Sequence, residues 1–470
     1  MPTRHGHERR RDRTGKLGAS MAAAFASRGL HVVGVDVDER AVRLLDRGEA
    51  PVRETDLARC VHEHRARIRA TSSHRDAVLS TDCSFVIVPT PSAPDGSFSL
   101  EHAASAFRAI GEALAERDGY HTVVLTSTVL PGATRYALLP ILEQASGKRA
   151  GEDFGLCYSP EFVALGSVLH DLLHPDMTLV GELDERSGGV VEDIYSRVVV
   201  NDAPCRRMSL ENAELAKLAV NTFITMKISF ANALAELCER LPGGDVDAVT
   251  AAVGTDSRIG RRYLTGSLGY GGPCFPRDTT AMSRLAELVG SEAPLAEATE
   301  TFNRSLLDRT IRKLRSRIAA GTPVAVLGLA YKPHSHVVEA SQGLYLAKAL
   351  AAAGARVVAY DPLVDETARA EIGDGVRLSS SVHDCIEGSE VVLIATPDDL
   401  FRTLRAEDFS RGPGPRSRRA TVIDFWRILA ADVAESGAVD YIAAGRDSDP
   451  QANADRLRCV WDEAVGRPVS

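Results

Sequence analysis

The sequence lacks the long apolar run that a membrane-spanning helix requires. No uninterrupted stretch reaches the roughly eighteen apolar residues of such a helix. The N-terminus is rich in arginine but has no apolar stretch behind it, so it does not have the pattern of a secretory signal. We therefore expect a soluble cytoplasmic protein with no membrane partner.

Paired cysteines and a net positive charge are missing as well. The eight cysteines are scattered through 470 residues without a Cys-x-x-Cys pair, which is not the pattern of a disulfide framework. The formal net charge is −9. Because nucleic acids are bound through basic faces, this charge argues against a nucleic-acid partner. An anionic ligand would need local positive charge.

What the sequence does contain is an alternation of short apolar strands and amphipathic helices, which is typical of an α/β protein. A chain of 470 residues exceeds the usual size of a single core, so it predicts two or three domains. In the first half we expect buried strands at residues 30–36, 84–89 and 122–126 and helices at 18–28 and 100–116. In the second half we expect buried strands at 322–330, 355–361, 391–396 and 421–424.

Between these two halves the pattern changes. Residues 209–240 keep one uninterrupted helical period, and a glycine-rich loop follows at 260–272. We predict an α/β fold in which two doubly wound Rossmann-like domains are joined by a helical middle domain with a long central helix. The expected division is 1–202 for the first Rossmann-like domain, 203–302 for the helical middle domain, and 303–470 for the second Rossmann-like domain.

A partial dinucleotide-binding motif lies near the N-terminus. Such a motif places glycines at a helix start, where backbone N–H groups approach a pyrophosphate. The segment Arg13-Thr-Gly15-Lys-Leu-Gly18 has the second and third glycines, whereas arginine occupies the first position. Asp36, at the end of the next strand, is placed to bind ribose hydroxyls and favours NAD over NADP. Two glycines arising by chance are the alternative explanation.

The segment ahead of this motif does not suit a Rossmann domain. Such a domain has an apolar first strand at its centre, but residues 5–12 read His-Gly-His-Glu-Arg-Arg-Arg-Asp. Burying each of these charges without a partner would cost several kcal/mol. Either the strand is supplied in another way, or the N-terminus as written is not the functional one, through a misplaced start or a frame error. The mass of the native protein tests the second possibility.

A cysteine near an aspartate is the sharpest chemical signal. The segment Gly269-Tyr-Gly-Gly-Pro-Cys274-Phe-Pro-Arg-Asp278 sets a thiol in a glycine-rich loop, four residues before a carboxylate. A thiolate is a strong nucleophile, and a nearby carboxylate can act as its acid–base partner. The alternative is an inert cysteine buried in a turn.

Polar residues on the long helix and after two strands could contribute to the same site. Glu214, Lys217 and Asn221 fall at i, i+3 and i+7 and can share one helical face, unless they form a solvated stripe. Thr126-Ser-Thr128 and Tyr158-Ser-Pro-Glu161 each follow a strand, at the sheet edge where doubly wound folds bind ligands.

The pair His170 and His174 superficially suggests a metal site. The two residues are one helical turn apart, but no third ligand is evident and the residue after His170 is aspartate rather than a metalloprotease glutamate. We expect no metal.

Together these segments resemble the UDP-glucose/GDP-mannose dehydrogenase family over residues 15–427. The most specific block is Asp256-Ser-Arg-Ile-Gly-Arg-Arg-Tyr-Leu264, which runs into the cysteine segment. Further segments follow in family order at family-like spacing: Pro89-Thr-Pro91, Ser127-Thr-Val129, Pro160-Glu161, Glu214-Leu-Ala-Lys217 and Gly328-Leu-Ala-Tyr-Lys-Pro333.

The resemblance implies an NAD-dependent four-electron oxidation of the C6 alcohol of a nucleotide sugar. By resemblance, Cys274 traps the aldehyde as a thiohemiacetal, the second hydride transfer leaves a thioester, and water releases the carboxylate. Lys217 and Asn221 would stabilise the developing oxyanion. The remaining implied catalytic residues position and deprotonate the alcohol or water and assist thioester hydrolysis, and they are Asp278, Thr128 and Glu161.

The resemblance also implies binding residues and an assembly. The cofactor would contact Gly15, Gly18, Asp36, Pro89, Thr90, Thr128 and Arg277. The nucleotide sugar would contact Phe162, Lys217, Asn221, Arg258, Tyr263, Leu264, Gly271 and Lys332. In the family the middle helix forms a dimer and residues like Arg258 reach the neighbouring subunit, so we expect a homodimer or a multiple of one.

Two substitutions depart from the family pattern in addition to the first strand. Many relatives carry an acid where Leu165 stands and an arginine where Glu339 stands, and exchanging a cation for an acid near an anionic ligand is not conservative. These departures leave the implied chemistry unchanged but affect which sugar is bound. From the resemblance UDP-glucose is the expected substrate, with a UDP-N-acetylhexosamine or GDP-mannose as alternatives. A catalytically impaired relative and a two-electron dehydrogenase without a cysteine nucleophile also remain open.

Overall fold

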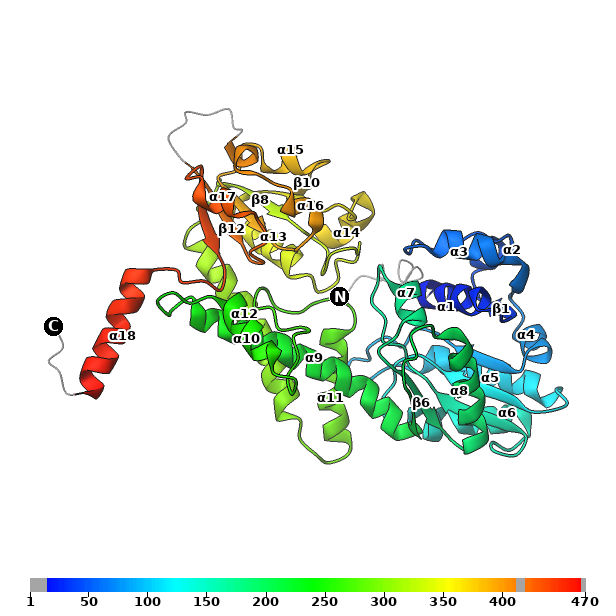
Figure 1. Ribbon diagram of the computed structural model, residues 1–470. Coiled ribbons are helices and arrows are strands. Elements are labelled where there is room, and N and C mark those ends of the chain that lie inside the picture. The colour runs from blue at the N-terminus through cyan, green and yellow to red at the C-terminus, as the bar shows by residue number, and fades with distance from the viewer. Residues whose placement is uncertain (1–14, 411–418, 466–470) are drawn as a thin grey trace, which may run out of the picture. The chain divides into compact units, whose positions relative to one another are not determined.

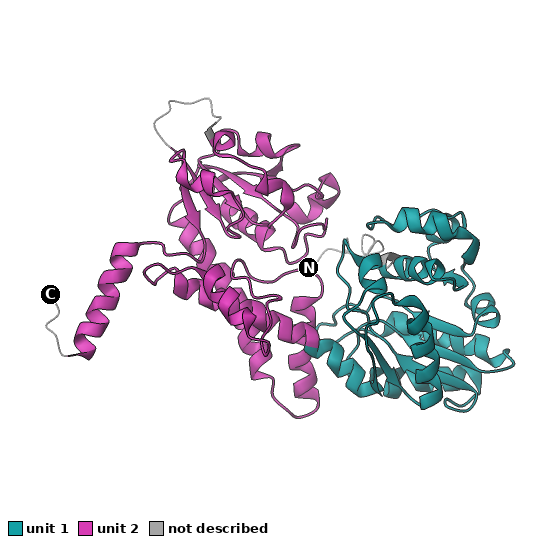
Figure 2. Ribbon diagram, viewed as in Figure 1, with its two compact units in different colours: residues 1–219 teal, residues 220–470 magenta. Residues whose placement is uncertain are grey.

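The computed structural model describes residues 15–410 and 419–465. The chain divides into two compact units, Met1–Ala219 and Val220–Ser470 (Figure 2). The boundary falls inside one helix, α9 (Leu210–Cys238). The two units are described separately below, and the expected division into three domains stays a prediction.

Unit 1 alternates strands with helices from its first described residues (Figure 1). Its helices are α1 (Gly15–Ser27), α2 (Glu39–Asp46), α3 (Leu57–His64), η2 (Arg65–Arg67), α4 (His74–Ser80), α5 (Glu101–Ala115), η3 (Ala133–Leu138), α6 (Leu139–Ser146), α7 (Val168–Leu173) and α8 (Glu185–Val198). Its strands are β1 (Val32–Val35), β2 (Ile68–Thr71), β3 (Cys83–Val86), β4 (His121–Leu125), β5 (Phe154–Tyr158), β6 (Thr178–Glu182) and β7 (Cys205–Ser209).

The strands of unit 1 form two separate pieces of sheet within the described residues. Five strands pair in the order β3-β4-β5-β6-β7, parallel except between β5 and β6. Strands β1 and β2 pair with each other in parallel and form the second piece. All residues of β4 and β5 are buried, as is typical of parallel strands covered by helices on both faces.

Unit 2 contains the rest of α9, a helical region and a second sheet. Its further helices are α10 (Val246–Thr255), α11 (Phe275–Leu288), α12 (Pro294–Arg315), α13 (Gln342–Ala352), η4 (Glu366–Ala368), α14 (Arg369–Ile372), α15 (Val382–Ile386), α16 (Asp399–Arg402), η5 (Ala406–Ser410), α17 (Ala431–Glu435) and α18 (Pro450–Ala464). Its strands are β8 (Pro323–Leu327), β9 (Arg356–Tyr360), β10 (Val376–Leu378), β11 (Val391–Ile394), β12 (Ala420–Asp424) and β13 (Val439–Ala443).

The sheet of unit 2 has the doubly wound order expected from the sequence. Six parallel strands pair as β10-β9-β8-β11-β12-β13, so the chain reverses its direction of travel across the sheet between β8 and β11. Doubly wound sheets bind ligands outside the carboxyl ends of the strands at such a switch point. The predicted fold class, with Rossmann-like sheets and a long central helix, is confirmed.

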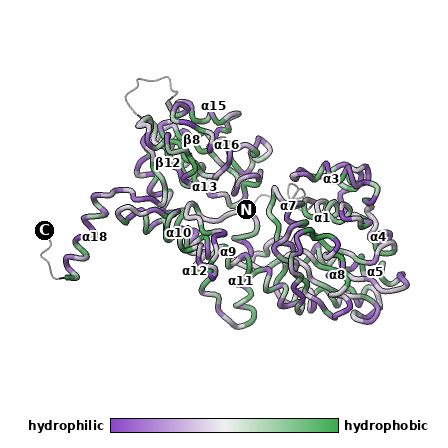
Figure 3. The backbone as a smooth tube through the Cα atoms, in the orientation of Figure 1, coloured by the Kyte–Doolittle hydropathy of each residue, from purple (hydrophilic) through white to green (hydrophobic). Residues whose placement is uncertain are grey.

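Side-chain caps explain where several helices begin. Asp38 accepts a hydrogen bond from the Arg40 N–H at the start of α2, and Ser73 accepts one from Asp76 at the start of α4. Ser341 does the same for α13. Apolar segments, green in Figure 3, lie in the interior of each unit, beside α1 in unit 1 and beside β8 in unit 2.

The expectation that no segment is long and apolar enough to span a membrane was wrong for helix α9. With 29 residues it is long and apolar enough to do so by length and composition, although its apolar residues are interrupted by charged ones. Length and composition do not distinguish a membrane span from a core helix. The carboxylate of Glu214 on this helix is fully buried and bonded to protein backbone, which is typical of a core helix.

Candidate active site

Hydrogen bonds tie together the chain segments that follow β3 and β4 in unit 1. The Ser127 hydroxyl donates to the Val88 carbonyl at 2.7 Å and accepts from the Val88 N–H at 2.9 Å. The Thr90 hydroxyl donates to the Thr128 carbonyl at 2.7 Å. These bonds hold Pro89, Thr90 and Thr128, three of the predicted site residues, at the carboxyl edge of the sheet.

Glu161 follows β5 at the same edge and is half-buried. Burial raises the pKa of its carboxyl group to about 7, although the Tyr195 hydroxyl, which donates to Oε1 at 2.9 Å, and the Lys217 charge oppose the rise. Tyr195 also forms a 2.8 Å hydrogen bond with Ser159. A carboxyl group with a pKa near 7 can exchange a proton at neutral pH, which is the requirement for a general acid or base.

Lys217 and Glu214 lie on the buried face of α9. The Lys217 ammonium donates to the Glu161 carbonyl at 2.7 Å and stands 4.6 Å from the centre of the Phe162 ring. Glu214 accepts hydrogen bonds from the Gly132 and Thr134 N–H groups at 2.5 and 2.9 Å, so it anchors the start of η3. The predicted side chains on this helix are buried, so the alternative of a solvated stripe is wrong.

Asp278 is the centre of a polar cluster in unit 2. Its fully buried carboxylate accepts a hydrogen bond from the Asn221 amide at 2.6 Å and another from Arg277 Nε at 2.9 Å. Burial acts to lower the pKa of Arg277, but Asp278, Cys274 and Glu339 outweigh it and the pKa is raised. The aspartate and its two partners are therefore held in one orientation.

Cys274 immediately precedes α11 and is exposed, so the alternative of a cysteine buried in a turn is wrong. The Asp278 N–H donates to the Cys274 carbonyl at 2.8 Å, which sets the thiol one helical turn from the buried carboxylate. A helix N-terminus favours negative charge through its unpaired N–H groups. The thiol is placed where a nucleophile can be reached from outside.

The loop ahead of Cys274 needs glycine because other backbone approaches it closely. A Cβ atom on Gly271 would lie 2.1 Å from the Ala340 carbonyl oxygen. Gly272 has φ +84°, and its N–H donates to the Glu339 carbonyl at 3.0 Å. The loop is thus held against the segment that carries Glu339, the residue that departs from the family pattern.

The predicted substrate-binding residues of unit 2 differ in exposure. Leu264 is buried, whereas the Tyr263 side chain is 48% exposed, with its ring in edge-to-face contact with Phe275 at 6.3 Å. The Arg258 side chain is 86% exposed and paired with Asp256 at 2.6 Å. Arg258 therefore points to solvent within its own unit.

Lys332 lies in the loop after β8, on the carboxyl side of the second sheet, with Nζ 6.0 Å from the centre of the Tyr331 ring. Asp361, at the end of β9, accepts hydrogen bonds from the Leu329 and Ala330 N–H groups, both at 2.9 Å. This aspartate holds the loop that carries Lys332.

The predicted dinucleotide-binding residues of unit 1 lie at the edges of α1 and β1. Gly15 begins α1, and no atom of residues 15–410 or 419–465 lies within 4 Å of a Cβ built on Gly18. Asp36 directly follows β1 and accepts a hydrogen bond from the Asp38 N–H. The charged segment 5–12 and Arg13 lie outside the described residues.

The two histidines of α7 do not come together with further metal ligands in the described part of the chain. The rings of His170 and His174 stack at 4.7 Å, and no group of three or more candidate ligands is found in residues 15–410 and 419–465. None of the eight cysteines forms a disulfide.

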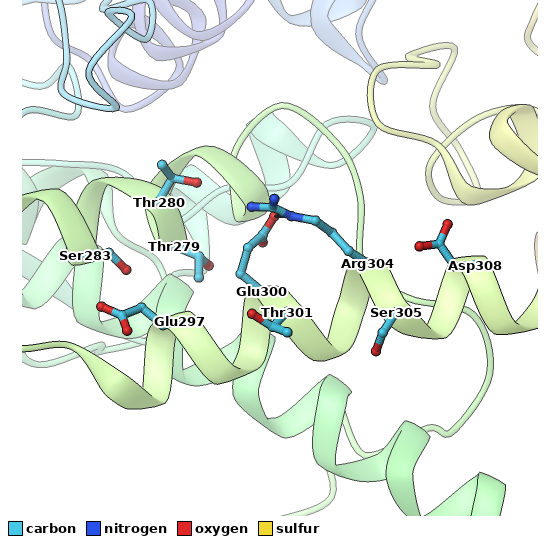
Figure 4. Close-up of a pocket in the computed structure, with 9 residues that line it drawn as sticks. All are labelled: Thr279, Thr280, Ser283, Glu297, Glu300, Thr301, Arg304, Ser305 and Asp308. Atoms are coloured by element: carbon cyan, nitrogen blue, oxygen red, sulfur yellow. Dashed lines mark hydrogen bonds and ion pairs between the residues drawn. The ribbon is translucent and has the colours of Figure 1, made fainter.

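A polar cavity of about 460 Å³ lies between α11 and α12 (Figure 4). None of the predicted site residues lines it. Glu300, on its wall, accepts hydrogen bonds from Arg304 at 2.8 Å and from the Tyr270 hydroxyl at 2.8 Å. Glu300 therefore links one wall of the cavity to Tyr270 of the glycine-rich loop.

Sequence reasoning missed residues that act through distant partners. Tyr195 lies 34 residues from Glu161, in a helix whose pattern shows only a buried face. Asn303 accepts from the Tyr270 N–H at 2.9 Å and donates to its carbonyl at 3.1 Å, yet it lies on α12. Acids at strand ends, such as Asp361, could have been predicted to be functional, because such positions border ligand sites in doubly wound sheets.

Three family models match the chain in sequence order. They describe the NAD binding domain, the central domain and the UDP binding domain of the UDP-glucose/GDP-mannose dehydrogenase family, and they match residues 13–199, 211–305 and 325–444. Among solved structures, that of a UDP-glucose dehydrogenase from Pyrobaculum islandicum is similar to this chain, with a TM-score of 0.82 and 34% sequence identity. The match covers 92% of this chain and 96% of that one.

Characterised relatives are similar over most of their length. The UDP-glucose 6-dehydrogenase of Haloferax volcanii is 38% identical, over 84% of this chain and 92% of that protein. The UDP-glucose 6-dehydrogenase of Bacillus subtilis is 34% identical over 82% of each chain. The GDP-mannose 6-dehydrogenase of Azotobacter vinelandii is 32% identical, over 85% of this chain and 93% of that protein.

These matches agree with the fold and extend through both units. The NAD binding model confirms the predicted cofactor, and the UDP binding model indicates a nucleotide sugar as the substrate class. The chain belongs to the UDP-glucose/GDP-mannose dehydrogenase family and is an NAD-dependent oxidoreductase.

Proposed function

We propose that this protein oxidises the C6 alcohol of UDP-glucose to the carboxylate of UDP-glucuronate, a precursor for polysaccharide biosynthesis. The reaction removes two hydrides and adds one oxygen atom from water. Relatives named UDP-glucose 6-dehydrogenase, at 38% and 34% identity, support this substrate. The observation that carries the proposal is the exposed thiol of Cys274, four residues before the buried and hydrogen-bonded carboxylate of Asp278. A two-electron dehydrogenase needs no cysteine nucleophile.

The first step oxidises the alcohol to an aldehyde. In this proposal Asp278 and Thr128 position the alcohol and take its proton, while a hydride leaves C6. Asn221 donates to the developing oxyanion, and Lys217 supplies a positive charge near it. NAD, when bound, supplies the acceptor for each of the two hydrides.

The second step uses Cys274. Its sulfur adds to the aldehyde carbon, so a C–S bond forms and the former carbonyl oxygen takes a proton to give a thiohemiacetal. Loss of the second hydride and of that proton leaves a thioester. Glu161 then takes a proton from water, the resulting hydroxide attacks the thioester carbon, and the C–S bond breaks to release the carboxylate and the thiolate.

Two observations support a fit between unit 1 and NAD. Helix α1 begins at Gly15, and no described residue fills the space beside Gly18, which suits the approach of a pyrophosphate to the start of the helix. Asp36 stands at the carboxyl end of β1, where a ribose hydroxyl would be bound, and Pro89, Thr90 and Thr128 line the neighbouring strand ends. Arg277 is proposed as a further contact.

For the nucleotide sugar we propose Lys332 and Arg258 as phosphate partners, because they supply positive charge that the chain as a whole lacks. The remaining proposed contacts surround the sugar and the uridine, and they are Phe162, Tyr263, Leu264 and Gly271. Glu339, where relatives carry arginine, is the residue that most directly affects the choice of sugar.

A homodimer through α9 is part of the proposal. Phe223, Phe230 and Leu237 recur every seven residues along this helix, and each is more than half exposed, at 57%, 54% and 58%. A heptad-spaced apolar seam is the pattern by which two helices pair. The strongly exposed Arg258 would then be available to the site of the other subunit.

The proposed chemistry also bears on location. Cys274 must remain a thiol between turnovers, which a reducing compartment ensures. We therefore place the protein in the cytoplasm, where sugar nucleotides and reduced cysteines coexist.

Product analysis across candidate substrates tests the proposed function. Purified protein is incubated with NAD and, separately, with UDP-glucose, UDP-N-acetylglucosamine or GDP-mannose, and the products are identified by mass. UDP-glucuronate formed fastest supports the proposal. An acid formed preferentially from either of the other two replaces the substrate assignment, and an aldehyde as the final product overturns the four-electron chemistry.

A further inference from the structure

A row of four oxygen atoms in unit 1 ends at the carboxyl group of Glu161. The Ser159 hydroxyl donates to the Leu179 carbonyl of β6 at 2.8 Å and lies 2.8 Å from the Tyr195 hydroxyl of α8. The Tyr195 hydroxyl lies 2.9 Å from Oε1 of Glu161. Ser159 is fully buried, and Tyr195 and Leu179 are almost so. The row therefore links a backbone carbonyl, away from solvent, to a side chain that the proposed chemistry uses.

The surrounding packing fixes the two hydroxyl oxygens of this row. The N–H of Ser159, directly after β5, donates at 2.8 Å to the carbonyl of Leu125, the last residue of β4. The Tyr195 ring packs in an apolar cluster with residues of β4, β5 and β6 and meets the Phe85 ring edge to face at 6.3 Å. Side chains in such close packing keep one position. The oxygen atoms therefore stay in place, and only the hydroxyl hydrogens are free to turn.

The direction of the hydrogen bonds in the row depends on the state of Glu161. A carbonyl has no proton, so the bond to Leu179 uses the proton of Ser159, and the bond between Ser159 and Tyr195 then uses the proton of Tyr195. In that case the contact between Tyr195 and Glu161 is a hydrogen bond only if the carboxyl group is protonated. When Glu161 is ionised, Tyr195 donates to it and Ser159 donates to Tyr195. The Leu179 carbonyl then loses its bond, so the protonated state makes three bonds and the ionised state two.

Tyr195 can turn its proton in this row but does not lose it. Burial raises the pKa of its hydroxyl well above the usual value, and the neighbouring Glu161 and Cys205 also act to raise it. Burial likewise raises the pKa of the Cys205 thiol, on β7, which therefore remains protonated near pH 7. Lys217 on α9 acts against burial on Glu161, whose pKa is raised to about 7. Near pH 7 the carboxyl group is thus the member of the row that gains and loses a proton.

We propose that Ser159 and Tyr195 form a reversible hydrogen-bond relay that positions Glu161 in both of its protonation states. The proposal rests on the proposed role of Glu161 as the base in thioester hydrolysis. When the carboxylate takes a proton from water, Tyr195 turns its own proton from Glu161 to Ser159. The proton of Ser159 then turns to the Leu179 carbonyl. Only the O–H bond of the water breaks, because each hydroxyl keeps its proton. Ser159 acts through Tyr195 and is therefore a positioning residue.

The relay predicts opposite effects for its two hydroxyl groups. Ser159→Ala removes two hydrogen bonds from the protonated state and one from the ionised state, so the pKa of Glu161 should fall. Tyr195→Phe leaves the carboxylate without this donor, and an unpaired buried charge costs more than an unpaired neutral group, so the pKa should rise. A loss of packing that admits water would instead lower the pKa of Glu161 in both variants, because it reverses the effect of burial.

Infrared difference spectroscopy of the full-length chain, without substrate or cofactor, tests the relay. The carbonyl band of the protonated carboxyl group is followed against pH, and subtraction of the Glu161→Gln spectrum assigns it. We expect the midpoint of Ser159→Ala to lie about one pH unit below that of the parent, which corresponds to one hydrogen bond. The midpoint of Tyr195→Phe should lie above that of the parent.

A matched control separates the relay from a general effect of removing a buried hydroxyl. Ser187→Ala removes a fully buried hydroxyl of the same helix α8, which donates to the Asp184 carbonyl, and it should leave the midpoint unchanged. A midpoint of Ser159→Ala at or above that of the parent overturns the relay. Tyr195→Phe adds no volume and keeps the test open if Ser159→Ala does not fold, since a midpoint at or below that of the parent also overturns the relay.

The rate of acid formation separates the relay from the proposed function. In single turnovers with UDP-glucose and NAD, the pH profiles of the variants should shift in the same directions as the infrared midpoints if Glu161 is the base. Infrared midpoints that shift as expected beside an unchanged rate profile would keep the relay and remove Glu161 from thioester hydrolysis.

Discussion

At the scale of single residues, the proposed chemistry rests on the exposed thiol of Cys274 and on the hydrogen bonds that orient the buried carboxylate of Asp278. Cys274 and Asp278 stand out because a cysteine in a glycine-rich loop before an acid is an uncommon arrangement. The sequence did not indicate which residues hydrogen-bond to Asp278. Asn221 lies 57 residues away, and Arg277 is the preceding residue, with no motif that marks it as a partner. Local spacing does not reveal such partners.

Cys274→Ser should block acid formation more than the first hydride transfer. A serine hydroxyl is a far weaker nucleophile than a thiolate at neutral pH, so the aldehyde is not converted to a thioester. The measurement is the ratio of aldehyde to acid by mass spectrometry in a single turnover. Cys459→Ser, at the other exposed cysteine, is the control and should behave as the parent. Equal loss in both variants would remove the special role of Cys274.

The pH dependence of thioester hydrolysis should follow the ionisation of Glu161. Because its pKa is about 7, the carboxylate that accepts a proton from water forms as pH rises through 7, and the rate should rise with it. Glu161→Gln should abolish this rise. Tyr195→Phe removes a donor that favours the ionised form, so the midpoint should move to higher pH. A midpoint that Tyr195→Phe leaves unchanged would contradict the coupling.

The same shift has a consequence for stability. The folded-state pKa of Glu161 lies above the ordinary 4.5, so folding favours the protonated form, and its stabilising contribution is lost as pH rises from 4.5 through 7. The free energy of unfolding of Glu161→Gln should therefore decrease less between pH 4.5 and pH 7 than that of the parent protein.

At the scale of elements, short apolar runs predicted β1, β3, β4, β8, β9, β11 and β12 to within a few residues, and helical periods predicted α1, α5 and α9. The strands β2, β6, β7, β10 and β13 were not predicted. The uninterrupted helical period of 209–240 corresponds to α9 at 210–238. The pattern could not show that Glu214 anchors η3, because the acceptor role depends on a segment 80 residues away. Nor could it show that the first sheet has two pieces within the described residues.

Glu214→Gln should destabilise unit 1. The buried carboxylate accepts from two N–H groups, whereas an amide offers only one acceptor oxygen and places an NH₂ group against the other donor. Leaving a buried donor unpaired costs about 1–3 kcal/mol in the free energy of unfolding. Glu211→Gln, on the same helix but in a part-exposed pair with Arg135, should cost about 1 kcal/mol or less. Chemical denaturation of both variants distinguishes the two.

Phe230→Glu should convert the proposed dimer to monomers. A charge placed in an apolar seam is desolvated when two helices pair, and in a symmetric pairing it also approaches its own copy. The measurement is molar mass by light scattering. Val460→Glu on α18, also about half exposed, is the matched control and should leave the mass unchanged. A parent protein that is already monomeric would remove the dimer from the proposal.

At the scale of the whole molecule, the net negative charge argues against nucleic acid as a main partner, and the order of motifs identified the family. The family matches extend through both units, and the NAD and UDP binding models fall at opposite ends of the chain. The sequence does not determine the sugar, because the family includes enzymes that act on different nucleotide sugars. The relatives include both UDP-glucose and GDP-mannose dehydrogenases.

The number of NADH molecules formed per UDP-glucose consumed tests the central claim most directly. It should be measured for the chain as written and for a variant in which an apolar five-residue segment replaces the charged residues 8–12. Two NADH for each UDP-glucose, with UDP-glucuronate as the product, is the predicted result in whichever form is active. One NADH with an aldehyde or ketone product would contradict the cysteine-dependent four-electron oxidation.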